Sequence, residues 1–364
     1  MRRLLAASLT VGLLAAPALA MDVPQFQVDP FWPKPLPNRW ILGQASGIAV
    51  DAQDHIWVIN RSRRLTDDEK AASLNPPQSK CCFPAPPIME FDSEGTFIQG
   101  WGGPAAGYEW PDMEHGIYVD PKGFVWIGGN GEKDGAVLKF TRDGKFVMQI
   151  GKNGAPTNSN DTTRFGRPAD FAVDPQANEV FISDGYFNHR VVVFDSESGA
   201  YKRHWGAYGK PPTDEKLAKY SPANPPSPQF GNPVHCVKIA KDGLVYVCDR
   251  ENNRIQVFRK DGSFVKEFII EKETLRGSIW DLTFWIDPEQ TYLLNVDGGN
   301  NELRTVKRET GEVVGTIGQQ GRNAGQFHWV HNIAIDSKGN VYTSEVGTGS
   351  RMQKFRYLGS PVTR

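Results

Sequence analysis

The sequence predicts an all-β protein that folds as a six-bladed β-propeller, and three observations support this prediction. The chain of 364 residues contains 37 Gly and 26 Pro, and 11% of its residues are aromatic, which is typical of strands joined by many turns. One pattern, two β-rich runs around a short turn, recurs six times along the chain. A further β-rich segment precedes the first repeat and matches the one strand that the last repeat lacks.

Residues 1–20, MRRLLAASLTVGLLAAPALA, have the pattern of a secretory signal peptide. Arg2 and Arg3 precede a short apolar run, and small residues mark a cleavage site after Ala20. The alternative is a membrane anchor, but the apolar run is shorter than the roughly 20 residues that a spanning helix needs. We therefore expect a secreted or periplasmic protein whose mature part, residues 21–364, is one propeller domain without membrane insertion.

The segment QFQVDPFWP, residues 25–33, is the next element and is predicted to be a strand. The sixth repeat ends soon after RMQKFRYLG and has no room for its own fourth strand. If the N-terminal segment completes that blade, the ring closes and no unpaired strand edge is left between its ends. A closed ring needs no partner chain, so we expect a monomer.

Six repeats follow, spaced about 50 to 70 residues apart, which is propeller spacing. Their first two strands are expected within residues 47–60, 116–129, 170–183, 236–248, 282–295 and 332–344. A third and a fourth β-rich run usually come next, as in RIQVFRKDGSFVKEFI. Residues 62–86 and 206–229 fit no blade, and because both are polar and rich in proline we interpret them as surface loops.

Alignment of the six repeats brings three histidines into one register. The aligned turn residues are Asp51, Asp120, Asp174, Ala240, Asp287 and Asp336. The residues five positions earlier are Ser46, His115, Ala169, His235, Leu282 and His331. An apparent one-residue shift in the fifth repeat would replace Leu282 by Asp281 there. The remaining histidines, at positions 55, 189, 204 and 328, show no such relation and are expected on the surface or in packing roles.

His115, His235 and His331 belong to alternate blades, which lie roughly 120° apart in a six-bladed ring. The start of each innermost strand lines the central channel, so three imidazoles at one height would converge on one point. Three histidines with an open fourth position are the ligand set of catalytic zinc. The alternative is that all three are buried packing residues that share a repeat position by accident.

The charge balance bears on the possible partners, and the cysteines bear on possible disulfides. The chain has 41 basic and 42 acidic residues, with no basic run, so nucleic acid is not an expected partner. Export favours disulfides. Cys236 and Cys248 face each other if Lys241–Gly243 is a three-residue hairpin loop, although opposed strand positions are usually slightly too far apart for a bridge. For Cys81 and Cys82 a vicinal bridge, a free pair and links elsewhere all stay open.

The run VYVCDRENNRIQVFRKDGSF resembles NHL repeats, and residues 43–358 resemble the peptidyl-α-hydroxyglycine α-amidating lyases. The resemblance implies a zinc ion held by His115 of EHGIYVD, His235 of VHCVKIA and His331 of VHNIAID. It also implies a catalytic tyrosine at Tyr186 of SDGYFNHRVVVF. Its substrate-binding arginines correspond to Arg61 of IWVINR and to Arg250 of CDRENNRIQ.

Strand direction agrees with these roles. Arg61, Tyr186 and Arg250 each come just after the second strand of a repeat, and in an antiparallel sheet that point lies on the same face as the start of the first strand. The implied reaction cleaves the N–C bond of an α-hydroxyglycine-type carbinolamide to an amide and glyoxylate. Tyr186 would act as the general base and the arginines would hold the substrate carboxylate. The expected partner is a small molecule or a peptide with a carboxylate.

The resemblance also implies a calcium ion, held by two backbone carbonyls and by an aspartate directly after the third histidine. The carbonyl positions correspond to Ile48 and Ile117, but the aspartate position is Asn332, whose amide oxygen can coordinate calcium without supplying charge. The cysteine that follows the family's catalytic tyrosine is Phe187 here, so that family disulfide is absent.

Two other functions stay open. A propeller lactonase or hydrolase would also use a metal on the axis, although such enzymes usually rely on Glu, Asn and Asp rather than on three histidines. A non-enzymatic NHL propeller would bind protein or glycan, and a metal would then be structural or missing.

Overall fold

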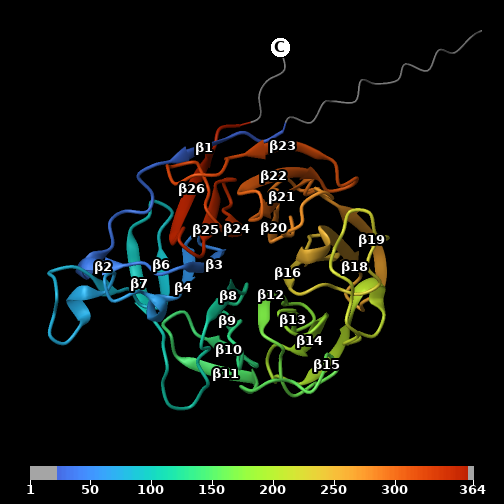
Figure 1. Ribbon diagram of the computed structural model, residues 1–364, viewed down its shortest axis with the longest axis horizontal. Helices are drawn as coiled ribbons and strands as arrows, with labels where there is room; N and C mark the ends of the chain where they lie inside the picture. Colours follow the sequence, from blue (N-terminus) through green and yellow to red (C-terminus); the bar gives the residue numbers. More distant parts are fainter. Residues whose placement is uncertain (1–22, 360–364) are drawn as a thin grey trace, which may run out of the picture.

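The computed structural model describes residues 23–359 as six four-stranded antiparallel sheets, the blades, arranged in a ring around a central axis (Figure 1). The six-bladed propeller predicted from the repeats is therefore confirmed. The predicted leader, residues 1–20, lies outside the described residues. Within the described range, no helix is long and apolar enough to span a membrane.

Blades 1 to 3 follow one another along the chain. Blade 1 contains β3 (Ala45–Val50), β4 (Ile56–Asn60), β6 (Ile88–Phe91) and β7 (Phe97–Trp101). Blade 2 contains β8 (Glu114–Val119), β9 (Val125–Gly129), β10 (Ala136–Phe140) and β11 (Phe146–Gly151). Blade 3 contains β12 (Pro168–Asp174), β13 (Glu179–Asp184), β14 (Arg190–Asp195) and β15 (Tyr201–Trp205).

Blades 4 to 6 complete the ring. Blade 4 contains β16 (Val234–Ile239), β17 (Val245–Asp249), β18 (Arg254–Phe258) and β19 (Phe264–Ile269). Blade 5 contains β20 (Asp281–Phe284), β21 (Tyr292–Asp297), β22 (Glu302–Lys307) and β23 (Val313–Ile317). Blade 6 contains β24 (Val330–Ile335), β25 (Val341–Glu345), β26 (Arg351–Tyr357) and the N-terminal β1 (Phe26–Asp29).

The two ends of the chain meet in blade 6, as the missing fourth strand predicted. Strand β1 pairs antiparallel with β26, from Phe26 opposite Tyr357 to Asp29 opposite Lys354. The N-terminal strand therefore supplies the outer edge of a blade whose other three strands come from the end of the chain (Figure 1). This pairing closes the ring through backbone hydrogen bonds.

Short helical turns and one small sheet lie outside the blades. The turns are η1 (Pro37–Arg39), η2 (Ser62–Arg64), η3 (Ala71–Ser73), η4 (Ala207–Gly209) and η5 (Arg250–Asn252). Strand β2 (Trp40–Ile41) pairs in parallel with β5 (Phe83–Pro84). The predicted surface loop 62–86 therefore contains some regular structure of its own.

The recurring aspartate used for the alignment stabilises the turn between the first two strands. The Asp51 carboxylate accepts hydrogen bonds from the backbone amides of Gln53 and His55 and from the Trp57 indole. The Asp120 carboxylate accepts an equivalent set, ending with the Trp126 indole at 2.9 Å. Because the same local contacts form in successive blades, equal sequence offsets from this turn correspond to equal heights in the ring.

The apolar core is divided among the interfaces between blades. Between blades 1 and 2, for example, Trp57 and Ile59 pack against Ile117 and Ile127, and all four are at most 5% exposed. The blade 6–blade 1 interface is built in the same way and also includes Trp32, from the segment after β1. Each blade therefore depends on its neighbours for burial, which holds the inner strands at fixed positions around the axis.

Candidate metal centre

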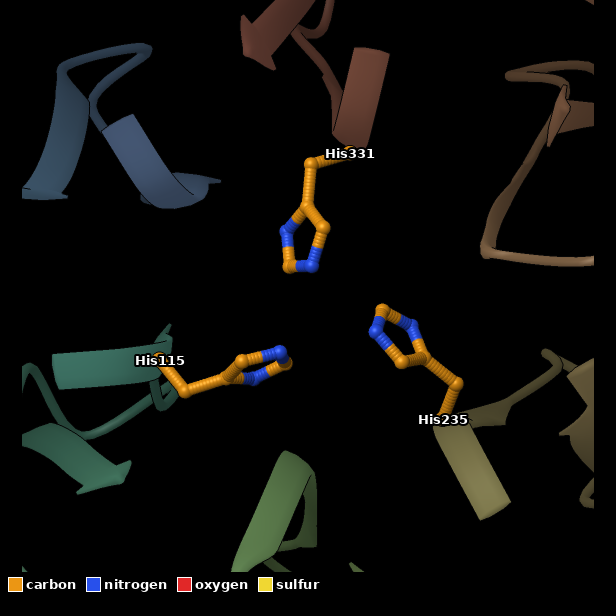
Figure 2. Close-up of side chains that lie close together, drawn as sticks. All are labelled: His115, His235 and His331. Carbon is orange, nitrogen blue, oxygen red and sulfur yellow. The ribbon is translucent and has the colours of Figure 1, made fainter. Parts of the chain in front are cut away.

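Each site histidine lies at a bulge near the start of an inner strand. In β16 the pairing with β17 skips from Val234 to Cys236, so His235 has no partner residue. In β24 the pairing skips His331 in the same way, and in β8 the irregularity includes His115. A bulge turns the extra residue away from the ordinary alternation of the strand. Here it directs three side chains toward the axis (Figure 2).

The three imidazoles lie close together from three alternate blades, as Figure 2 shows. Their ring centroids are 4.8 to 5.1 Å apart, and one nitrogen from each ring lies within 4.8 Å of the other two. All three side chains are buried, with His331 the most exposed at 2%. The convergence predicted for His115, His235 and His331 is therefore present in the structure; their metal-binding role stays a prediction.

A backbone carbonyl from the following blade contacts the Nδ1 atom of each histidine. His115 Nδ1 lies 2.9 Å from the Ala169 oxygen, and His331 Nδ1 lies 2.9 Å from the Ser46 oxygen. His235 Nδ1 contacts the Trp280 oxygen in the same way. Because a carbonyl only accepts hydrogen bonds, Nδ1 carries the proton and Nε2 keeps a lone pair. Such a carbonyl partner orients metal-binding histidines in proteins.

The environment keeps these imidazoles neutral, which is the form that binds a metal. Burial, followed by the positive charge of Arg61, lowers the pKa of His331 to about 3. Burial also lowers the pKa of His115 and His235 well below the usual value of about 6.5. Three buried lone pairs of neutral imidazoles therefore face one another, and they fit a divalent metal such as zinc.

Tyr186 lies beside this histidine cluster. It follows β13 by two residues, and its hydroxyl lies 2.9 Å from Nε2 of both His115 and His235. A phenol has one proton and can donate to only one of these two acceptor nitrogens. One Nε2 lone pair beside the Tyr186 hydroxyl is therefore left without a proton donor from that hydroxyl. This is a second observation that favours a cation at this point.

Arg61 and Arg250 lie at the same end of the axis. The Arg61 guanidinium donates to the backbone oxygen of Glu114 at 2.8 Å. It also donates to the side-chain amide oxygens of Gln44 at 2.9 Å and Asn130 at 3.1 Å. Burial lowers the pKa of this guanidinium. These three acceptors are all neutral, so Arg61 places a buried positive charge at the site without an acidic hydrogen-bond partner.

Arg250, at the start of η5, is held by aromatic rings. Its guanidinium carbon lies 4.5 Å from the Trp280 ring centroid and 5.8 Å from that of Tyr186. Its nearest acidic partner is Glu251, at 3.5 Å, and its Nε atom is buried without a hydrogen-bond partner. Both arginines therefore have capacity to bind an anion beside the histidines.

In the fifth repeat, the residue at the histidine-equivalent position is not the one that the sequence alignment predicts. Neither Leu282 nor Asp281 occupies the position equivalent to the histidines; Trp280 does, because its carbonyl contacts His235 as the Ala169 carbonyl contacts His115. The reason is the length of the turn: Asp287 follows Trp280 by seven residues, whereas five separate the equivalent positions in the other blades. The shift is therefore two residues rather than one.

An ion cluster lies further along the inner strands: its aspartates follow Ala169 and Trp280 by one residue, and its lysine follows His235 by three. The Lys238 ammonium lies 2.8 Å from Asp170 and 3.2 Å from Asp281, and these two aspartates are at most 3% exposed. Burial alone would lower the pKa of Lys238, but the two carboxylates raise it. Sequence analysis did not identify this cluster, because its members are far apart in the chain and belong to no motif.

The calcium site at Ile48, Ile117 and Asn332 stays a prediction, and the contacts of Asn332 argue against it. The Asn332 amide nitrogen donates to Asp281 at 2.9 Å, and its oxygen contacts Nδ1 of His331. Calcium coordination would break the second contact, and the Asp281 carboxylate beside Asn332 is already paired with the Lys238 ammonium. The residues present therefore do not fit calcium as well as the histidines fit zinc.

Both pairs of cysteines are bridged. Cys236 and Cys248 are directly opposed in β16 and β17 with their Cα atoms 4.8 Å apart, and Cys81 is bridged to Cys82. The first bridge ties together the two inner strands of blade 4, directly beside His235. Phe187, next to Tyr186, is 49% exposed.

Comparison with known proteins places these observations in context. An NHL repeat family model matches residues 234–258. The chain is 28% identical over 330 residues to a probable peptidyl-α-hydroxyglycine α-amidating lyase of Caenorhabditis elegans, covering 87% of this chain and 83% of the relative. It is 27% identical over 330 residues to the peptidylglycine α-amidating monooxygenase of Rattus norvegicus, covering 86% of this chain. The match spans 30% of that longer relative's length.

Two solved structures share the fold. A streptogramin B lyase has a TM-score of 0.52 at 13% identity, with 91% of this chain and 98% of that chain covered. A catalytically inactive virginiamycin B lyase from Staphylococcus aureus, solved with quinupristin, has a TM-score of 0.50 at 15% identity, with 94% and 89% covered. The predicted resemblance to the amidating lyases is confirmed, and the named relatives support a lyase of this kind.

Proposed function

We propose that this protein is a zinc-dependent lyase that cleaves α-hydroxyglycine-type carbinolamides, HO–CH(COO⁻)–NH–CO–R, to an amide and glyoxylate. The observation that carries the proposal is the contact of Tyr186 with two of three converging histidines. Tyr186 would then act as a proton acceptor directly beside the atoms that would hold the metal. The named relatives support the same reaction class.

His115, His235 and His331 would hold the zinc ion, which when bound supplies Lewis acidity toward the substrate hydroxyl. Nδ1 of each ring donates to a carbonyl of the next blade, so the protein fixes the orientation of all three ligands. The neutral state of the imidazoles means that no proton has to leave them before a metal binds.

Tyr186 would move the proton. In its phenolate form, its oxygen would accept the proton of the substrate hydroxyl, the O–C bond would become a carbonyl, and the C–N bonding pair would leave with the amide nitrogen. The same proton then passes from Tyr186 to that nitrogen, so the products are glyoxylate and a neutral amide. No water is consumed, and no oxidant or reductant is needed.

Arg61 and Arg250 would hold the substrate carboxylate. Neither guanidinium has a short ion pair with an acidic residue, and Arg250 has a buried Nε atom without a hydrogen-bond partner. A planar guanidinium matches a carboxylate with two parallel hydrogen bonds. The carboxylate next to the reacting carbon would therefore set the position of the hydroxyl relative to Tyr186.

We also propose that the mature protein is an exported monomer, on the basis of the predicted leader and the closed ring. Fractionation of cells that express the full chain, together with light scattering of the purified mature form, tests both points. Retention of an uncleaved chain in the membrane, or a dimeric mass, would contradict them.

The decisive experiment combines metal analysis with turnover of α-hydroxyhippurate. We expect one zinc per chain, and benzamide and glyoxylate in equal amounts. Bound zinc without glyoxylate would show that the substrate is wrong, and lactone hydrolysis by the same protein would favour the hydrolase alternative. A folded protein that holds no metal and produces no glyoxylate would favour the non-enzymatic binding alternative. A fully active protein without any metal would show that the histidines have a structural role.

A further inference from the structure

A pocket of about 420 Å³ lies on blades 5 and 6, at the same end of the axis as the metal centre. Its walls come from the loops before β20, after β21 and before β24. The lining residues are Arg276, Gly298, Gly299, Asn301, Gln320, Gly321, Arg322, His328 and Trp329. None of the residues that we assign to the metal centre lines this pocket.

Two tryptophans connect the pocket to the metal centre. The Trp329 ring, in the pocket wall, lies 5.9 Å from the Trp280 ring between centroids. Trp280 in turn lies 5.8 Å from His331 and carries the Arg250 guanidinium at 4.5 Å. The pocket is therefore separated from the histidines by about one indole ring, which is within reach of a substrate held at the metal centre.

The pocket has a positive charge that nearby acids do not neutralise. Arg276 is exposed, its guanidinium carbon lies 5.1 Å from the Trp329 ring centroid, and no acidic group among residues 23–359 forms an ion pair with it. Arg322 donates to the backbone oxygen and the hydroxyl of Thr348, at 2.8 and 3.1 Å. No Asp or Glu lines the pocket.

Two acidic residues that adjoin the pocket wall are already paired with other arginines. Asp297, which precedes Gly298, pairs with Arg304, and Glu345 pairs with Arg351 at 2.7 Å. These two acids are fully buried, so they are shielded from a ligand in the pocket. A pocket lined by two arginines and no acidic residue therefore lies beside the metal centre.

We propose that this pocket receives a carboxylate carried by the acyl part of the substrate. This inference rests on the proposed function and narrows its substrate class to α-hydroxyglycine amides whose acyl group is acidic. In such a substrate Arg61 and Arg250 hold the carboxylate next to the reacting carbon, and Arg276 holds the second one. Trp280 and Trp329 pack against the spacer between them.

The first test measures binding without turnover, by calorimetry with 4-carboxybenzamide and with benzamide as its uncharged match. We expect the acid to bind at least about tenfold more tightly, and Arg276→Gln to remove most of that difference. Arg259→Gln is the control, because Arg259 is also exposed but lies in the β18–β19 turn at the other end of the axis. Equal binding of both amides would overturn the inference. It would also be overturned if the binding of 4-carboxybenzamide depended on Arg250 and not on Arg276.

The second test compares turnover of α-hydroxyhippurate and its 4-carboxy derivative. We expect kcat/KM to favour the derivative, and Arg276→Gln to lower it by about tenfold to a hundredfold for the derivative only, mainly through KM. If neither compound yields glyoxylate, the proposed function is wrong. The calorimetric result still decides whether the pocket binds a carboxylate. If both are cleaved equally well by wild type and variant, the lyase stands and the inference falls.

Discussion

The imidazole Nδ1 of His115 lies 2.9 Å from the carbonyl oxygen of Ala169, the residue that occupies the histidine's own position in the next blade. The same relation joins His331 to Ser46 and His235 to Trp280. The site therefore has approximate threefold symmetry within a sixfold ring, with the histidines on even-numbered blades and their supporting carbonyls on odd-numbered ones.

Replacement of one ligand should remove the metal. We expect His235→Ala to reduce the bound zinc from one equivalent to below about a tenth, because two imidazoles do not complete the tetrahedral set. Glyoxylate production should fall with it. His204→Ala, which lies outside the cluster, is the matched control for both measurements. Full metal content in His235→Ala would show that this histidine is a packing residue.

The Tyr186 hydroxyl should affect the reaction but not the metal. In Tyr186→Phe the ring can keep its packing against His115, at 4.9 Å between centroids, while the proton acceptor is lost. We expect kcat to fall by about 10²- to 10⁴-fold with unchanged zinc content. Tyr220→Phe serves as the control. A variant with near-normal kcat would remove Tyr186 from the mechanism.

The buried carboxyl of Asp170 should give a specific pH dependence of stability. Burial raises its pKa to about 6, although the Lys238 ammonium opposes the shift. The folded state therefore binds this proton more tightly than the unfolded state, so the stabilising contribution is present below about pH 4 and lost as the pH rises through about 6. We expect the unfolding free energy of wild type, minus that of Asp170→Asn, to decrease between these values. Urea titrations across the range measure it, and a difference that increases with pH would contradict it.

The Lys238 ammonium should stabilise the inner strands, and bound calcium should not be needed for stability. We expect Lys238→Met to lower the unfolding free energy by about 3–5 kcal/mol, because Asp170 and Asp281 would lose the cation between them. Lys216→Met, at an exposed lysine, should have little effect.

For the wild-type protein, the calcium chelator EGTA should leave Tm unchanged. A loss of Tm that added calcium restores would instead support the ion predicted at Ile48, Ile117 and Asn332.

The repeat pattern alone predicts the blade number, the strand that closes the ring and the common height of His115, His235 and His331. It could do so because a repeat carries its own register: the turn aspartate binds amides two and four residues away, so equal offsets give equal heights. The fifth repeat shows the limit of this argument. Its longer turn displaced the alignment by two residues and hid the role of Trp280.

The groups that surround the histidines come from neighbouring blades. The carbonyl of Ala169, the ion cluster around Lys238 and the path from Trp280 to Trp329 all join residues of different blades. No periodicity or spacing in the chain encodes such contacts, because they depend on how the closed ring packs one blade against the next. Local hydrogen bonding therefore set the height of the three histidines, and contacts between blades decided their tautomers, their neighbours and the charge around them.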